Sequence, residues 1–314
     1  MTPLCIFTRA PRRPTWVVAI SLGSILVAAC SDGRNGRTHA EETGAGTAPS
    51  MTATTDDGFT TVPNSSAASG DQLAASFDEL AASIRATVGV SIASDTGVRT
   101  FGTWIIGPAW STIKVPLSLA AMRRSAEDAA GLVSLAIRDS DNEAAEKLWS
   151  QLGPPTQAAA AVAAVLSEAG DNSTVVQSER VRPGFSAFGQ TAWGLVPQAV
   201  FAAALPCMAG MDPVVDAMRS LGGNQQWGFG GRPDTAAKGG WGPDSDGQYL
   251  VRQIASVSIP SGNLGVALAA APQDGDFKSG TDTINALASW VADHFDSFAG
   301  VRCGPDAGVD GGSR

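Results

Sequence analysis

Apolar positions recur along the chain with two different periods, and each period predicts a different element. From 71 to 86 they are spaced by three or four residues, as on one face of a helix, and they are Leu73, Phe77, Leu80 and Ile84. From 88 to 104 they alternate instead, and the sequence Asp-Thr-Gly at 95–97 interrupts the alternation. Alternation on both sides of such a turn predicts a β-hairpin.

The remainder divides into a helical middle and a strand-rich end. Apolar spacing predicts helices over 111–124, 142–152, 156–169 and 191–204. Strand-like runs follow from 235 onward, over 251–259 and over 264–271, and a closing helix fits 279–298. This order predicts a single sheet whose edge strands come from opposite ends of the chain.

The first 29 residues predict an export signal. Three arginines precede an apolar stretch, Trp16–Ala29, as in secretory signal peptides. The stretch ends in Leu26-Val27-Ala28-Ala29-Cys30, which resembles a bacterial lipobox and implies that Cys30 becomes the lipidated first residue of the mature protein. We therefore expect an exported protein that is lipid-anchored at the extracytoplasmic face of the cell membrane. A retained membrane helix is the alternative, although about 14 apolar residues fall short of the roughly 20 that span a bilayer.

Composition sets the expected domain boundaries. Residues 31–70 are mostly Ser, Thr, Gly, Ala, Pro and Asp, with Phe59 as the only aromatic, and cannot bury enough apolar surface to fold. We expect a lipoprotein signal peptide at 1–29, a lipidated cysteine with a disordered tether at 30–70, one folded domain at 71–303 and a flexible tail at 304–314. The pair Arg12-Arg13 leaves twin-arginine export open beside the general secretory route.

Charge, histidine and cysteine usage exclude several function classes. The chain has 21 basic and 30 acidic residues, and loss of the leader with its three arginines leaves a formal charge of −12, which disfavours nucleic-acid binding. Histidine is limited to His39 and His294, so no cluster exists to hold zinc and we expect neither a metal nor another cofactor. Cys207 and Cys303 are expected to form a disulfide in an oxidising compartment, with two free buried thiols as the alternative.

Two of only four lysines lie in short motifs that a serine-acylating site requires. Lys114 follows Ser111 by three positions, which places both on one face of a helix. Ser140-Asp141-Asn142 opens the next predicted helix, and Lys238-Gly239-Gly240 begins a strand. Each motif alone has an ordinary explanation, namely a solvated Ser/Lys pair, a helix N-cap or a turn. Their order and the scarcity of lysine favour a catalytic interpretation.

With these motifs, residues 72–298 resemble the serine β-lactamase and penicillin-binding-protein family, and in particular class A β-lactamase-related lipoproteins of actinobacteria. The segment GVSIASDTG is similar to the first strand of that family, and WSTIKVPLSLAA is similar to its nucleophile helix. The resemblance implies an α+β fold of the α/β-sandwich kind. An antiparallel sheet would carry helices on both faces beside a reduced helical subdomain.

The resemblance also implies a role for each motif residue. Ser111 is the expected nucleophile, and Lys114 takes its proton because burial beside a second cation, Lys238, lowers the pKa of that lysine. Ser140 would pass the proton to the leaving nitrogen, and the backbone N–H groups of Ser111 and Trp241 would form an oxyanion hole. The expected substrate-binding residues are Asn142, Lys238, Gly240, Trp241 and Arg252.

Three departures from the family pattern lower the expected activity. Gly239 stands where the family has a hydroxyl residue, so one hydrogen bond to a substrate carboxylate is missing. Ser111 and Ser140 are only 29 residues apart, which leaves little room for a helical hairpin between them. The water-activating glutamate lacks a clear counterpart. Glu179 is the candidate for a deacylation base, and a surface ion pair with its neighbouring arginines is the alternative.

We therefore expect a membrane-anchored serine hydrolase of the cell envelope, of β-lactamase or DD-peptidase type. It would form an acyl-Ser111 intermediate with a β-lactam or a peptidoglycan-type peptide. The rival hypothesis is a relative without catalytic activity that binds cell-wall peptide or another envelope protein. Gly239 and the missing glutamate favour the rival. Retention of five motif residues favours the enzyme, namely Ser111, Lys114, Ser140, Asn142 and Lys238.

Overall fold

A computed structural model describes residues 65–304 of the chain. The expected signal peptide, Cys30, most of the expected tether and nearly all of the expected tail lie outside the described residues. The first described helix, α1 (Ser65–Ser83), begins before the expected domain boundary at residue 71. Within the described range, no single helix is long and apolar enough to cross a membrane. Two segments, Leu195–Cys207 and Asp212–Arg219, reach that length and composition only together, and they are bent by 111°.

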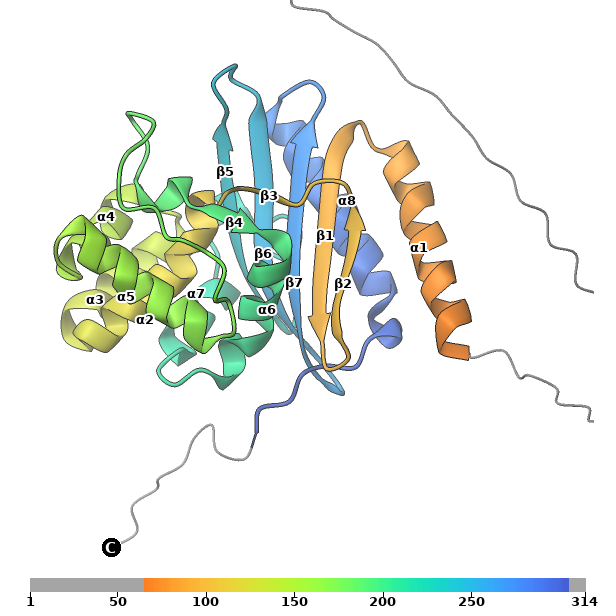
Figure 1. The fold of residues 1–314 in the computed structure, drawn as a ribbon, viewed down its shortest axis with the longest axis horizontal. Helices are drawn as coiled ribbons and strands as arrows, with labels where there is room; N and C mark the ends of the chain where they lie inside the picture. The colour runs from red at the N-terminus through yellow and green to blue at the C-terminus, as the bar shows by residue number, and fades with distance from the viewer. Residues whose placement is uncertain (1–64, 305–314) are drawn as a thin grey trace, which may run out of the picture. The chain divides into compact units, whose positions relative to one another are not determined.

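Five antiparallel strands form the main sheet, in the spatial order β2-β1-β7-β6-β5. The hairpin strands β1 (Ala86–Ser94) and β2 (Gly97–Gly102) come from the N-terminal side. The strands β5 (Thr235–Pro243), β6 (Tyr249–Ile259) and β7 (Gly262–Pro272) follow near the C-terminal end. The prediction of one sheet with edges from opposite ends of the chain is confirmed, and β5 is the edge beside the helical group (Figure 1).

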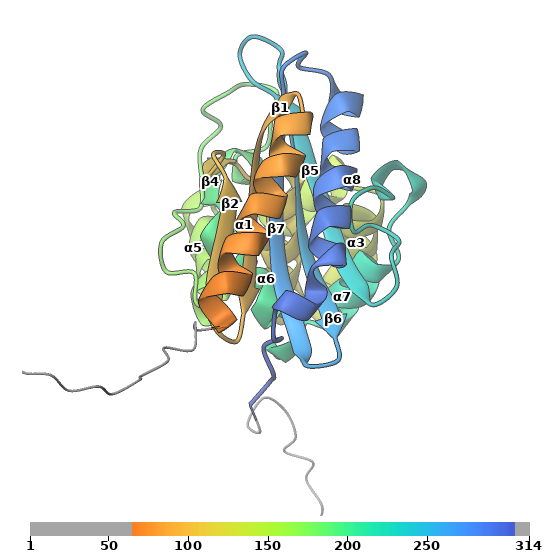
Figure 2. The ribbon, with the colours of Figure 1, turned by 90° about the vertical axis from the view of Figure 1, so that its right-hand side faces the viewer.

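Helices cover both faces of this sheet. Figure 2 shows α1 and α8 (Phe277–Asp293) next to each other on one face. Phe77, Phe101 and Trp290 pack there with ring centroids 5.0 to 5.4 Å apart and join α1, β2 and α8. On the other face, α6 (Leu195–Ala204) packs closely on β7. The close packing requires glycine at position 265, since a Cβ there would collide with the backbone of α6. The expected α+β sandwich is therefore present.

A group of helices lies beside β5, at the edge of the main sheet (Figure 1). It contains α2 (Lys114–Arg124), α3 (Ala126–Arg138), α4 (Asn142–Gln151), α5 (Pro155–Glu168) and α7 (Asp212–Arg219). The apolar pattern did not predict α3 or α7. The short spacing between Ser111 and Ser140 thus accommodates one helix after α2, namely α3, whose N-cap Ser125 accepts a hydrogen bond from Asp128 N.

A small second sheet corrects one predicted helix boundary. Residues 191–204 were expected to be helical throughout, but β4 (Ala192–Gly194) pairs with β3 (Ile106–Pro108), and α6 begins only at Leu195. This pairing holds the segment before Ser111 against the segment before α6. The backbone N–H of Ala109 also donates to Thr191 O over 2.7 Å.

The C-terminal segment is tied back to the domain in two places. Cys207, in the short 3-10 turn Leu205–Cys207, forms a disulfide with Cys303. Val301 pairs with Asn263 at the start of β7. The residues after α8 are therefore fixed to the end of the sheet opposite the β5–β6 turn.

Candidate active site

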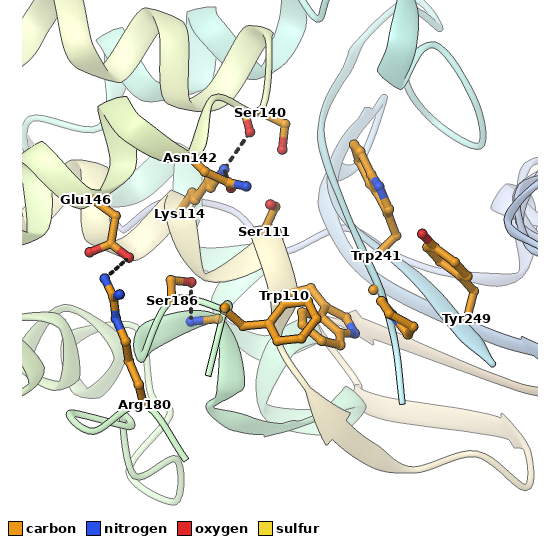
Figure 3. Close-up of a pocket in the computed structure, with 15 residues that line it drawn as sticks. Trp110, Ser111, Lys114, Ser140, Asn142, Glu146, Arg180, Ser186, Trp241 and Tyr249 are labelled. Atoms are coloured by element: carbon orange, nitrogen blue, oxygen red, sulfur yellow. Dashed lines mark hydrogen bonds and ion pairs between the residues drawn. The ribbon is translucent and has the colours of Figure 1, made fainter. Parts of the chain in front are cut away.

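A cavity of about 360 Å³ lies between the helical group and β5. Four residues of the first two sequence motifs line it, namely Ser111, Lys114, Ser140 and Asn142. Figure 3 shows these side chains converging from the turn before α2, from α2, from the turn before α4 and from α4. Lys238 does not line the cavity. Its side chain is fully buried, and it contacts the cavity lining through a hydrogen bond to the hydroxyl of Ser140.

Ser111 lies in a 3-10 turn, Trp110–Ile113, that leads directly into α2. Trp110 precedes it with a φ of 49°, a left-handed conformation that is uncommon for a residue with a side chain and concentrates at functional sites. Near the start of a helix, backbone N–H groups lack intrahelical acceptors and favour negative charge. The Ser111 hydroxyl points into the cavity and makes no hydrogen bond within residues 65–304 (Figure 3).

Gly240 allows β5 to approach this turn. A Cβ at position 240 would lie 2.9 Å from Ala109 O and 3.0 Å from Ser111 N. The backbone of β5 therefore passes directly against the Ser111 N–H, and Trp241 is the next residue along the strand. This close approach is what the expected oxyanion hole of Ser111 and Trp241 N–H groups requires.

Lys114 is buried and donates three hydrogen bonds from Nζ. The acceptors are Ser140 O at 2.6 Å, Asn142 Oδ1 at 2.8 Å and Asp141 O at 3.1 Å. Burial lowers the pKa of Lys114 to about 7, although the carboxylates of Asp141 and Glu146 act to raise it. All three N–H groups of the ammonium form are thus engaged, and the described contacts include no hydrogen bond from Lys114 to Ser111 Oγ.

Ser140 connects the two motif lysines. Its carbonyl oxygen accepts from Lys114, and its hydroxyl accepts from Lys238 over 2.9 Å. Ser140 has a φ of 56°, which turns the chain so that the carbonyl and the hydroxyl serve different partners. Asp141 then caps α4 by accepting from Ala144 N over 2.6 Å. The N-cap explanation of this motif is thus correct for Asp141 and compatible with a site role for its neighbours.

Lys238 is enclosed by oxygen acceptors. Besides Ser140 Oγ, its ammonium donates to Gln225 Oε1 over 2.5 Å and to Gly239 O over 2.7 Å. Burial, followed by the charge of Lys114, lowers the pKa of Lys238 well below its ordinary value. The charge of one lysine was expected to lower the pKa of Lys114. It lowers the pKa of Lys238 instead, and the lowered pKa of Lys114 is caused by burial.

Trp227 occupies the space that a side chain at position 239 would need. A Cβ on Gly239 would lie 2.5 Å from Cζ2 of Trp227 and 2.7 Å from its Cη2. The hydroxyl missing from the third motif is therefore replaced by an aromatic ring that packs edge-to-face against Trp241. The lack of a side chain at Gly239 therefore leaves no empty space, because the Trp227 ring fills it.

Arg252 does not reach the cavity, which corrects its expected role as a substrate ligand. Its side chain is fully buried, and its Nη atoms donate to the carbonyls of Gly107, Pro108 and Trp193 and to Gln198 Oε1. It therefore fastens the β3–β4 sheet and α6 to β6. Arg252 is not among the residues that line the cavity.

The carboxylate in the cavity is Glu146, a residue that sequence reasoning did not select. Glu179 is exposed, lies outside the cavity lining and makes no ion pair in the described structure. Its neighbour Arg180 instead donates from Nη2 to Glu146 Oε1 over 2.9 Å (Figure 3). The available signal was the spacing, because Glu146 is four residues after Asn142 on α4 and faces the same side of the helix.

Aromatic residues and a loop complete the cavity walls. Trp110, Trp241, Phe185 and Tyr249 line it. Residues 171–190 form the loop that carries Phe185, and Arg182 holds this loop to the β5–β6 turn. The guanidinium of Arg182 lies 4.6 Å from the Phe185 ring centroid and donates to Pro243 O and Asp244 O.

His294 and the acidic residues supply no alternative centre. The His294 ring is half-buried and lies within hydrogen-bonding distance of Ser76 Oγ and Trp290 O, away from the cavity. Between residues 65 and 304, no group of three or more His, Cys, Asp or Glu side chains is arranged to hold a metal ion. The convergent polar groups of this part of the chain are those around Ser111.

Comparison with solved structures identifies the architecture. No protein-family model and no curated protein matches the chain. A class A β-lactamase from Mycobacterium abscessus is similar, with 17% identity and a TM-score of 0.58 over 71% of this chain and 99% of that one. The TLA-3 extended-spectrum β-lactamase shares 14% identity, with a TM-score of 0.59 over 72% and 98%. The class A β-lactamase of the last common ancestor of Gram-negative bacteria shares 21% identity, with a TM-score of 0.54 over 71% and 99%.

Proposed function

We propose that this chain, which has the serine β-lactamase fold, is a serine hydrolase that forms an acyl intermediate on Ser111. The observation that carries the proposal is the position of Ser140, which bonds both motif lysines beside the open Ser111 hydroxyl. Neither amine points into bulk water, because both are buried and bonded within the site. A serine hydroxyl needs such a nearby base to act as a nucleophile.

Acylation proceeds by proton transfer along this set of residues. Loss of a proton from Lys114 leaves two N–H groups and a lone pair, so one of its three hydrogen bonds is released and the lone pair can accept the Ser111 proton. Ser111 Oγ attacks the carbonyl carbon, and the N–H groups of Ser111 and Trp241 hold the developing oxyanion. The C–N bond then breaks. Ser140 gives its hydroxyl proton to the leaving nitrogen and is reprotonated by Lys238, which donates to that hydroxyl, so the step leaves Lys114 protonated and Lys238 neutral.

The substrate class is a β-lactam or a peptidoglycan-type peptide. The amide NH₂ group of Asn142 makes no hydrogen bond within the described residues, while its Oδ1 is held by Lys114. It is therefore available to an amide carbonyl of the substrate. The buried Lys238 acts on a substrate carboxylate only through its charge and through Ser140, so recognition of that carboxylate is weaker than direct pairing would give.

The protein acts at the extracytoplasmic face of the cell membrane, held by a lipid on Cys30. The proposal rests on the apolar leader and on the Leu-Val-Ala-Ala-Cys sequence at 26–30. Fractionation of cells that express the full chain tests it. The wild type is expected in the membrane fraction, Cys30→Ala is expected to lose the lipid, and a wild type found in the cytosol overturns the localisation.

A fold that only binds cell-wall peptide or an envelope partner is the second candidate. It is favoured by the engagement of all three Lys114 donors elsewhere than at Ser111, and by the Trp227 ring in place of a hydroxyl residue at 239. Such a protein would bind substrate without a covalent step.

Covalent labelling separates the two candidates. A fluorescent penicillin is expected to label the wild type and Ser150→Ala, in which an exposed serine far from the cavity is removed, but not Ser111→Ala. Mass spectrometry of a digest should place the adduct on the peptide that contains Ser111. An unlabelled wild type that still binds the penicillin would overturn the hydrolase and leave the binding protein.

A further inference from the structure

Hydrolysis of an acyl-Ser111 intermediate requires a base that deprotonates water. This inference rests on the proposed function, because it concerns the second half of the same reaction. Among the residues that line the cavity, Glu146 supplies the carboxylate. The question is whether its surroundings suit a proton acceptor or only a structural ion pair.

Glu146 is positioned by the helix that also presents Asn142. The two residues are separated by four positions on α4, so their side chains lie next to each other on the cavity face. Asn142 bonds Lys114, and Glu146 is near enough to raise the pKa of that lysine. Figure 3 shows the carboxylate on the Lys114 side of the cavity, paired with Arg180.

Arg180 leaves half of this carboxylate free. Its Nη2 donates to Oε1 over 2.9 Å, and Oε2 makes no hydrogen bond to any residue between 65 and 304. The Glu146 side chain keeps 36% of its surface exposed, so water has access to it. One oxygen is therefore restrained and the other is available to a water molecule in the cavity.

The other acidic residues near the site are committed elsewhere. Asp141 accepts from Ala144 N as the cap of α4. Glu143 is exposed and pairs with Lys147 over 2.7 Å. Glu179 lies outside the cavity lining. These contacts leave Glu146 as the carboxylate that shares a cavity with Ser111.

We propose that Glu146 is the general base of deacylation and that Arg180 positions it. Oε2 takes a proton from water, and the water oxygen attacks the acyl carbonyl carbon. The tetrahedral intermediate collapses by breaking the bond from carbon to Ser111 Oγ, and the proton held by Glu146 passes to that oxygen. The products are the free serine and the carboxylic acid of the substrate.

Acyl-enzyme lifetimes measured by mass spectrometry test this assignment. A general base contributes about 10²- to 10⁴-fold to a rate, so Glu146→Gln is expected to lengthen the lifetime by about 100-fold or more while acylation changes by less than about threefold. Two matched controls, Glu143→Gln and Glu179→Gln, should keep the wild-type lifetime. Arg180→Ala should lengthen the lifetime without slowing acylation, and Arg180→Lys should recover part of the loss.

A second variant separates a proton acceptor from a structural contact. In Glu146→Ala, added formate is expected to shorten the acyl-enzyme lifetime, because a small carboxylate can occupy the vacated space and accept the proton. The same formate should leave Glu143→Ala unchanged. A structural role for the Glu146–Arg180 pair predicts no response to formate in either variant, which would overturn the assignment.

The remaining outcomes distinguish this proposal from the proposed function. A wild type that is never acylated overturns both. A wild type that is acylated but releases no product keeps the acyl-Ser111 step of the proposed function and overturns the role of Glu146. Equal lifetimes for the wild type and Glu146→Gln, or a long lifetime for Glu179→Gln, overturn only the assignment of Glu146.

Discussion

Lys114 and Lys238 bond to opposite ends of one residue, Ser140, and not to each other. The first donates to its carbonyl oxygen over 2.6 Å and the second to its hydroxyl over 2.9 Å. Two buried amines are thereby held close together with their charges directed at oxygen. Burial lowers the pKa of Lys114 to about 7, and Lys238 orients the Ser140 hydroxyl, which serves the leaving group in the proposed reaction.

The rate of Ser111 acylation is expected to rise with pH and to level off above about pH 7. The free amine of Lys114 is the active form, and burial lowers the pKa of this lysine to about 7. Below that pH the ammonium predominates, so the rate should increase roughly tenfold from pH 5 to pH 6, as for any single ionising base. The measurement is labelling by a β-lactam between pH 5 and pH 9, corrected for hydrolysis without protein. A flat or falling profile contradicts Lys114 as the base.

Replacement of Lys238 by Met is expected to slow acylation by about 100-fold, because Ser140 loses the donor that orients its hydroxyl. Lys278→Met is the matched control, since Lys278 is an exposed lysine that pairs with Asp282. Labelling rates of the two purified variants, with thermal melts to establish folding, make the comparison. Equal rates in both variants would show that Lys238 has no part in the reaction.

Gly240→Ala is expected to reduce acylation and to destabilise the fold by about 1–3 kcal/mol, the usual cost of forcing an extra group into a packed site. The added methyl group would meet Ala109 O, Thr112 N and Ser111 N at 2.9 to 3.0 Å. Gly131→Ala is the control, because this glycine is inside α3 with open space around it and its replacement should stabilise by about 0.5–1 kcal/mol. Chemical denaturation measures both, and an unaffected Gly240→Ala would mean that β5 does not touch the Ser111 turn.

Gly239→Thr is expected to fail to restore the hydroxyl residue of the third motif. The new side chain collides with the Trp227 ring, so the single variant should unfold more easily by about 1–3 kcal/mol. Combination with Trp227→Ala removes the collision, and the two changes should be less destabilising together than the sum of each alone. A double-mutant cycle of unfolding free energies measures this coupling, and simple additivity would place Trp227 away from position 239.

The sequence was sufficient for the sheet and for most helices, and the misses have physical causes. The buried positions of α3 include Ala129, Val133 and Ala136, and alanines give a weak apolar signal. The start of α6 was placed too early because residues 192–194 pair with β3, a contact between distant segments that no local pattern reveals. In the second case local propensity yields to tertiary pairing.

The candidate site could be predicted as far as its short motifs and no further. Ser111, Lys114, Ser140 and Asn142 converge on one cavity as their order suggested. Glu146 was missed because a charged residue on a helix ordinarily faces solvent, and its partner Arg180 is 34 residues away in the chain. Arg252 was misplaced because only the fold reveals that its donors bond the backbone around β3 and β4.

The disulfide makes the stability of the domain depend on the oxidation of two cysteines. Cys207 and Cys303 enclose a covalent ring that contains all three C-terminal strands and therefore Lys238 and Trp241. A freshly synthesised chain in a reducing cytoplasm lacks this ring, and its unfolded form keeps more conformational freedom. The full stability of this domain is thus coupled to the oxidation of Cys207 and Cys303, and preparations made without oxidation contain a less stable protein.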